Sequence, residues 1–185
     1  MKGIVFSEFL EMVEDRYSPE VADQIIENAN LESGGSYTTV GTYPHSELVA
    51  LVTSLAEISG EESANLLRTF GRHLLFRFKE IYPEFFEGIS SSFDLLDTID
   101  NHVHIEVKKL YPDAELPRFN CDRTNDGTLI MSYSSRRALA DLAHGLIEGA
   151  VEIWQENVAI HREDSRSEGC DGIVNMARFT LTMTD

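Results

Sequence analysis

The architecture of this chain can be worked out from one stretch, Phe93-Asp-Leu-Leu-Asp-Thr-Ile-Asp-Asn-His-Val-His-Ile-Glu-Val-Lys-Lys-Leu-Tyr-Pro-Asp-Ala-Glu-Leu-Pro117. Its apolar residues recur every three or four positions, at Leu96, Ile99, Val103, Val107 and Leu110. This spacing is typical of an amphipathic helix with one buried face. We therefore predict a helix here whose apolar stripe faces the interior, with Ser92 as its N-cap.

Two histidines lie within this stretch, at positions 102 and 104. Successive helical residues are rotated by about 100°, so residues two apart cannot both face one site. His104 falls beside the apolar stripe and is predicted to face inward, whereas His102 is predicted to face outward. An inward imidazole beside an apolar face can be the axial ligand of a haem iron. The alternative is a core histidine that is hydrogen-bonded to the backbone.

The composition limits the classes of function. With 185 residues the chain is long enough for one domain with a substantial core. Its 32 acidic and 15 basic residues give a formal net charge of -17, which disfavours binding to nucleic acid or to anionic membranes. No apolar run reaches the roughly 18 residues needed to span a bilayer, and we expect a cytoplasmic protein. Cys121 and Cys170 do not form a Cys-x-x-Cys pair.

Apolar periodicity and turn residues divide the rest of the chain into elements. Helices are predicted at 4–13, 18–30, 45–60 and from about 63 to 82, with a short extended piece at 36–42. Short strands are predicted at 118–123 and 128–133, then an amphipathic helix at 138–154, then strands at 158–163 and 173–182 that flank an exposed loop. Helices followed by a small antiparallel sheet packed with helices indicate an α+β fold.

Gly145 and Gly149 lie four apart on the helix predicted at 138–154. Glycines at this spacing allow a backbone or a ligand to approach closely. Both tight helix packing and a ligand site remain open.

Tyr133, Ser135 and Arg137 alternate along the end of a predicted strand. In extended chain, alternate residues project to the same side. Two hydroxyls and a guanidinium on one face are suited to holding a carboxylate. A haem presents an iron to an imidazole and two propionates to such donors, so this motif and His104 have complementary roles.

Several segments together resemble the haem–nitric oxide/oxygen binding (H-NOX) domains, the family that also includes the sensor part of soluble guanylate cyclases. The resemblance covers essentially the whole chain. Its segments are Met1-Lys2-Gly3, Phe70-Gly71-Arg72 with Phe78, His104-Ile-Glu-Val-Lys-Lys-Leu-Tyr-Pro112, Leu116-Pro117-Arg118-Phe119, Tyr133-x-Ser135-x-Arg137 and Gly145-Leu146-Ile147-Glu148-Gly149.

The resemblance implies a stand-alone bacterial sensor domain with a helical N-terminal subdomain at 1–62 and a haem-holding subdomain at 63–185. It also implies that His104 ligates the iron of haem b (iron protoporphyrin IX) and that Tyr133, Ser135 and Arg137 hold the propionates. Pro117 would pack against the porphyrin and help to distort it. The distal wall would consist of Val5, Phe9, Leu74, Phe78, Leu142 and Leu146.

Leu142 stands where family members that bind oxygen stably carry a tyrosine, and Leu74 stands at a neighbouring distal position. Bound oxygen draws negative charge and gains about 1.5–3 kcal/mol from a donor, whereas nitric oxide on ferrous haem needs little such help. We therefore expect a nitric oxide sensor that excludes oxygen, with carbon monoxide as a second candidate ligand.

The resemblance further implies that the protein is not an enzyme. Nitric oxide would weaken the iron–His104 bond, and the resulting shift would pass to a separate histidine kinase or cyclic-di-GMP enzyme. A haem-free protein-interaction module on the same fold is the alternative. Hydrolysis by acid–base catalysis or by a bound metal is disfavoured, because a helical-wheel projection spreads Asp100, Glu106 and the two histidines over several faces of the helix.

Three further features bear on metal sites. His73, His144 and His161 are expected to be exposed, although each could in principle supply a sixth iron ligand. Cys121 as a redox group or haem ligand is a minor alternative. The zinc site of some family members is expected to be absent, because the matching region offers only His161 and Cys170 among aspartates.

Overall fold

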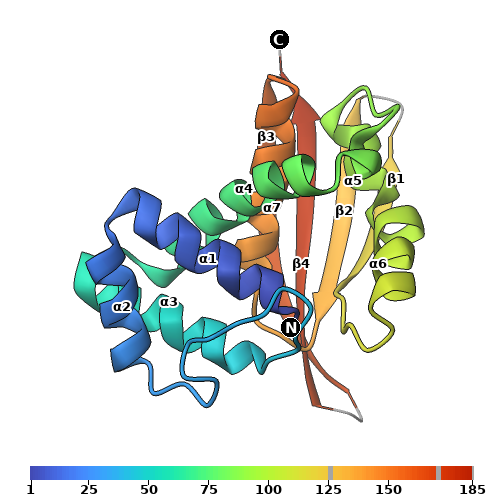
Figure 1. The fold of residues 1–185 in the computed structure, drawn as a ribbon. Helices are drawn as coiled ribbons and strands as arrows, with labels where there is room; N and C mark the ends of the chain where they lie inside the picture. The colour runs from blue at the N-terminus through green and yellow to red at the C-terminus, as the bar shows by residue number, and fades with distance from the viewer. Residues whose placement is uncertain (125–126, 170–171, 185) are drawn as a thin grey trace.

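Helices make up the first half of the chain, and a four-stranded sheet dominates the second half (Figure 1). The computed structural model describes residues 1–124, 127–169 and 172–184. The helices are α1 (Gly3–Arg16), α2 (Pro19–Asn28), α3 (His45–Ser59), α4 (Ser63–Ile81), α5 (Ser92–Thr98), α6 (His104–Leu110) and α7 (Ala140–Ile153), with a 3-10 turn η1 (Pro83–Phe86) and a π-helical turn η2 (Ile99–Val103). None of the described helices is long and apolar enough to cross a bilayer.

The strands form one antiparallel sheet in the order β1-β2-β4-β3. They are β1 (Arg118–Arg123), β2 (Thr128–Ser135), β3 (Val158–Gly169) and β4 (Gly172–Met183). The predicted α+β class, with its helical first part and small antiparallel sheet, is confirmed. Of the turn predicted between the first two strands, residues 125 and 126 lie outside the described residues.

Two extended segments differ from the predictions. The short extended piece predicted at 36–42 is interrupted by a turn at residues 39 and 40, and Thr42 forms an isolated bridge to Lys2. The predicted exposed loop at 164–172 mostly belongs to β3 and β4, which pair along twelve residues from Val158–Met183 to Gly169–Gly172. These strands extend past the rest of the sheet in Figure 1. Alternation fails there because β3 is exposed on both faces beyond Arg162.

Capping residues fix the helix boundaries that the sequence predicted. Ser18 accepts a hydrogen bond from the backbone N–H of Val21, and Pro19 begins α2. Gly60 ends α3 in the left-handed region, at φ 74°, where a side chain would be strained.

Helices α4 and α7 pack so closely that glycine is required at their crossing. A Cβ atom at Gly71 would overlap the carbonyl oxygen of Leu142, and one at Gly145 would overlap that of Arg68. A Cβ at Gly149 would lie 3.2 Å from that of Leu75. Of the two roles open for Gly145 and Gly149, the structure shows helix packing.

Two hydrophobic clusters form the core. The first joins α1, α2, α3 and α4 with Leu139 and Leu142 of the α7 region. The second lies between α5, α7 and the sheet. The division into subdomains at residues 62 and 63 stays a prediction.

The stretch from Phe93 to Leu110 is not one regular helix. Between α5 and α6 the π-helical turn η2 intervenes, and the backbone N–H of His104 bonds to the carbonyl of Ile99, five residues back. Ser91, rather than the predicted Ser92, caps α5 by accepting from the N–H of Asp94 at 3.1 Å. The buried stripe also ends early, since Leu96 is 2% exposed and Leu110 is 61% exposed.

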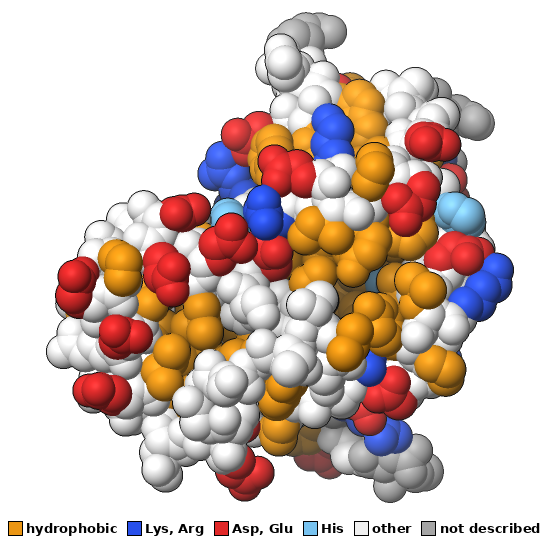
Figure 2. Space-filling model, viewed as in Figure 1, with side chains coloured by type: hydrophobic (Ala, Val, Ile, Leu, Met, Phe, Trp, Pro, Cys, Tyr) orange, Lys and Arg blue, Asp and Glu red, His pale blue; other side chains and the backbone are white. Residues whose placement is uncertain are grey.

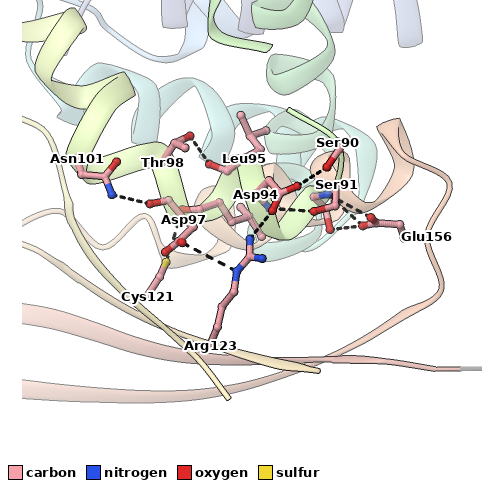
Figure 3. A network of polar contacts seen from close by, with 12 residues as sticks. Ser90, Ser91, Asp94, Leu95, Asp97, Thr98, Asn101, Cys121, Arg123 and Glu156 are labelled. Carbon is pink, nitrogen blue, oxygen red and sulfur yellow. Dashed lines mark hydrogen bonds and ion pairs between the residues drawn. The ribbon is translucent and has the colours of Figure 1, made fainter. Parts of the chain in front are cut away.

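Polar contacts fix α5 to strand β1 and to the segment that connects α7 with β3 (Figure 3). Arg123 of β1 donates to Asp94 at 2.8 Å, and Glu156 accepts from the backbone N–H and the hydroxyl of Ser92. Hydrogen bonds from Ser90 and then Arg123 hold the pKa of Asp94 at about 2. Because α6 contains no fully buried residue, anchoring to the core is concentrated in α5, directly before the π turn.

Candidate functional site

His104 is the first residue of α6, and its side chain is 16% exposed. Its Nδ1 atom lies 2.9 Å from Oδ1 of Asp100, which leaves Nε2 as the ring nitrogen able to coordinate a metal. Burial lowers the pKa of His104, while Asp100 acts in the opposite direction. The ring is therefore predominantly neutral near pH 7, as an iron ligand must be. His102 is exposed, so the predicted orientations of both histidines are confirmed.

Pro117 and His104 line the same cavity, of about 170 Å³, together with Asp100, Ile105, Lys108, Leu116 and Arg118. The ring of Phe119 lies 5.9 Å from the His104 ring and 5.4 Å from that of Tyr133, between centroids. An aromatic contact thus connects the histidine with the Tyr-x-Ser-x-Arg motif.

Tyr133, Ser135 and Arg137 come together at the end of β2. The Tyr133 hydroxyl donates to the carbonyl oxygen of Arg137 at 3.3 Å, and the N–H of Arg137 donates to the Ser135 hydroxyl at 3.1 Å. Burial raises the pKa of Tyr133, so its hydroxyl stays protonated as a donor. The Arg137 guanidinium donates to the Glu115 carboxylate at 2.7 Å and to its backbone carbonyl at 3.1 Å. This guanidinium is therefore placed to hold carboxylates.

The N-terminal segment brings the Met1 ammonium and His45 into the electrostatic environment of Arg137. Burial and then the Arg137 charge lower the pKa of the Met1 ammonium and that of His45. Lys2, whose side chain is 13% exposed, lies against Asp113. The Glu115 and Asp113 carboxylates pair with Arg137 and Lys2, so an incoming carboxylate would meet cations that already have acidic partners.

The residues predicted to line the distal wall come from α1, α4 and α7 and belong to the first hydrophobic cluster. Phe9, Leu74 and Leu142 are buried within it, and Val5, Phe78 and Leu146 pack against it while partly exposed. All six side chains are apolar, so none of them can donate a hydrogen bond. Figure 2 shows hydrophobic side chains gathered around a hollow on this face of the molecule.

Two residues of the site were not identified from the sequence. Asp100 was considered only among acidic residues and histidines spread over several helix faces, and its pairing with His104, four residues further on, was not predicted. Glu115 was not considered, since its contact with Arg137 spans 22 positions in the chain.

Other candidate ligands lie elsewhere. His73 and His144 were predicted to be exposed, but their side chains are only 23% and 12% exposed, whereas that of His161 is 73% exposed. Burial raises the pKa of Cys121 to about 11, and its Sγ donates to the carbonyl of Leu96. A protonated thiol with this pKa is a poor ligand and a poor nucleophile. Cys170 lies outside the described residues.

The sequence and the fold match those of one known family. A family model described as haem-NO-binding matches residues 2–162. Among curated proteins, the soluble guanylate cyclase gcy-35 of Caenorhabditis elegans is 25% identical over 179 residues, which cover 94% of this chain and 26% of that protein. The soluble guanylate cyclase gcy-32 of the same organism is 24% identical over 153 residues, covering 80% and 22%. The chain thus spans about a quarter of the length of these relatives.

Solved structures show the same fold. The Fe(II) unliganded H-NOX protein from K. algicida is 34% identical, with a TM-score of 0.84 over 100% of this chain and 97% of that one. The H-NOX protein from S. oneidensis in the Fe(II)NO ligation state is 23% identical, with a TM-score of 0.85 over 100% of both chains.

Proposed function

Because the chain belongs to the haem-NO-binding (H-NOX) family of haem-binding gas-sensor domains, we propose that it binds haem b through His104 and senses nitric oxide. The observation that carries the proposal is the hydrogen bond between Nδ1 of His104 and Asp100, which orients a mostly buried imidazole and leaves Nε2 for iron. When bound, the haem supplies an iron at which a diatomic gas can coordinate.

The residues present fit such a group on two further counts. Arg137 holds a carboxylate, that of Glu115, so the same donor suits a propionate. The hydroxyls of Tyr133 and Ser135 lie beside it, the first donating to the Arg137 carbonyl oxygen and the second accepting from the Arg137 N–H. Val5, Phe9, Leu74, Phe78, Leu142 and Leu146 offer an apolar surface of the kind that a porphyrin requires. Pro117 is proposed to contact the porphyrin from the His104 side.

Ligand choice is proposed to follow from the apolar distal residues. Without a donor at Leu142 or Leu74, bound oxygen lacks a hydrogen bond worth about 1.5–3 kcal/mol, or roughly one to two powers of ten in affinity. Nitric oxide depends far less on such a donor. The proposed sensor therefore binds nitric oxide, and carbon monoxide as a second gas, in preference to oxygen.

The proposed output is a change passed to a separate cytoplasmic protein, with a histidine kinase or a cyclic-di-GMP enzyme as candidates. His104 lies where α6 meets the π turn, and α6 leaves Ile105 and Leu110 48% and 61% exposed. A change in the strength of the proposed iron–His104 bond would thus act on a helix that is weakly anchored to the core, since α6 has no fully buried residue.

The deciding experiment is an absorption spectrum of the purified, anaerobically reduced protein, followed by exposure to air and then to nitric oxide. We expect a Soret band whose position does not change in air and shifts when nitric oxide is added. The His104→Ala variant should lack this band unless imidazole is supplied. His102→Ala is the matched control and should keep the band. A wild-type protein that stays colourless with added haem would overturn the proposal and favour a haem-free interaction module.

A further inference from the structure

Glu115 lies on the connection between α6 and β1 and places its carboxylate against Arg137. The Glu115 Oε2 atom accepts from Nη2 of Arg137 at 2.7 Å. The Glu115 side chain is 82% exposed, whereas that of Arg137 is 14% exposed. A flexible glutamate thus reaches from solvent onto a guanidinium that is held almost out of solvent.

The same connection is fixed at a second point, two residues earlier. Lys2 donates to both carboxylate oxygens of Asp113, at 2.9 and 3.1 Å, and the Thr42 hydroxyl donates to Oδ2 at 2.8 Å. The Lys2 ammonium also lies 4.8 Å from the centre of the Tyr111 ring. The backbone around Asp113 is therefore held by the N-terminal segment independently of Glu115.

Resting on the proposed haem site, we propose that Glu115 competes with a haem carboxylate for Arg137 and thereby sets how tightly the protein holds haem. The Nη2 group of Arg137 that donates to the Glu115 carboxylate is then less available to a second carboxylate. Two carboxylates that share one edge also repel each other. Because the Glu115 side chain is mostly in solvent, it can swing away at little cost, and the anchor at Asp113 keeps it close enough to return.

Orientation of Arg137 does not depend on the Glu115 carboxylate alone. Nη1 of Arg137 donates to the backbone carbonyl of Glu115 at 3.1 Å, and this contact does not require the side chain. Glu115→Gln removes the competing charge and keeps the size and the backbone acceptor. If Glu115 instead served to position Arg137, the same substitution would weaken haem binding, so the sign of the effect separates the two roles.

The test measures the rate of haem loss from the ferric protein to excess apomyoglobin, and requires no gas signalling. We expect Glu115→Gln to lose haem roughly two- to five-fold more slowly than wild type, the range given by removing one exposed ion pair. Arg137→Gln should lose haem faster, and the double variant should match Arg137→Gln because the competition acts through the guanidinium. Glu87→Gln removes an exposed charge elsewhere and should match wild type.

Unchanged or faster haem loss in Glu115→Gln, in a protein that loads haem through His104, overturns the competition and leaves the proposed function standing. A slowing that persists when Arg137 is already glutamine also overturns it, because the effect would then not pass through Arg137. Failure of the wild-type protein to take up haem overturns the proposed function itself.

Discussion

The Nδ1 atom of His104 lies 2.9 Å from Oδ1 of Asp100, within the segment where the π turn passes into α6. A carboxylate that accepts from one ring nitrogen fixes the tautomer and raises the basicity of the other nitrogen. Asp100 therefore controls both the direction and the donor strength of the proposed iron ligand.

Asp100→Asn is expected to keep the fold and to weaken haem binding roughly ten- to hundred-fold, the typical cost of losing a hydrogen-bond partner behind a metal ligand. The measurements are haem affinity and the iron–histidine stretching frequency, which should fall. Asp97→Asn is the matched control, because Asp97 lies one turn earlier and contacts Arg123 at 3.9 Å. Equal haem affinities for the two variants would contradict the role assigned to Asp100.

Leu142→Tyr is expected to raise oxygen affinity roughly ten- to hundred-fold by placing a hydroxyl donor in the distal cluster. Leu142 is 8% exposed, so the larger ring should also lower stability by about 1–3 kcal/mol. Leu142→Phe introduces the ring without the hydroxyl and controls for that crowding. Gas titrations of the ferrous proteins distinguish the effects, and an equal gain in the phenylalanine variant would show that the hydroxyl is irrelevant.

Gly145→Ala is expected to lower the free energy of unfolding by about 1–3 kcal/mol, because its Cβ would meet the backbone of Arg68, which cannot rotate away. For a chain of this size, the melting temperature should fall by several degrees. Gly149→Ala should cost much less, since its Cβ meets Leu75 at 3.2 Å and alanine favours the helix by about 1 kcal/mol. Equal melting temperatures for the two variants would argue against the described crossing of α4 and α7.

Acidification is expected to destabilise the protein partly through His73. Burial lowers the pKa of this histidine, although Glu8 acts in the opposite direction, and its Nε2 atom is buried without a hydrogen-bond partner. The unfolded chain therefore binds a proton near pH 6.5 that the folded chain binds only at lower pH, so stability falls as the pH drops below about 7.

His73→Gln should reduce the loss of stability between pH 7 and pH 5 in denaturant titrations at matched haem content. His161→Gln serves as the control, because the His161 side chain is 73% exposed. A slope unchanged by His73→Gln would show that the buried imidazole does not contribute to the acid sensitivity.

Local signals in the sequence predicted most of the elements. Ser18-Pro19 and Gly60 marked helix boundaries that hydrogen bonding confirms, and the spacing of apolar residues located α1, α4 and α7. The inward direction of His104 was predicted in the same way. These features depend on residues within a few positions of one another, and single-sequence patterns report on such distances well.

The remaining features depend on the backbone hydrogen-bonding pattern or on residues that are distant in the sequence. The spacing of apolar residues could not reveal the π turn. One additional residue changes the backbone hydrogen bonds of a helix, but it changes the spacing of apolar residues within a five-residue segment very little. The polar outer part of β3 and β4 is stabilised by backbone pairing without a buried face, so no alternation marked it. The contact between Glu115 and Arg137 joins separate elements, and no local pattern encodes it.

The π turn also bears on how the length of this chain can vary. A segment that closes with a bond to the fifth residue back contains one residue more than an α-helix needs for the same turn. Losing one residue between Ile99 and Val103 would therefore convert the turn to α-helix and leave the direction of α6 nearly unchanged. Losing one residue inside α5 would instead rotate everything after it by about 100°. We therefore expect relatives of different length to gain or lose a residue here while the direction of α6, and with it that of the histidine, stays nearly the same.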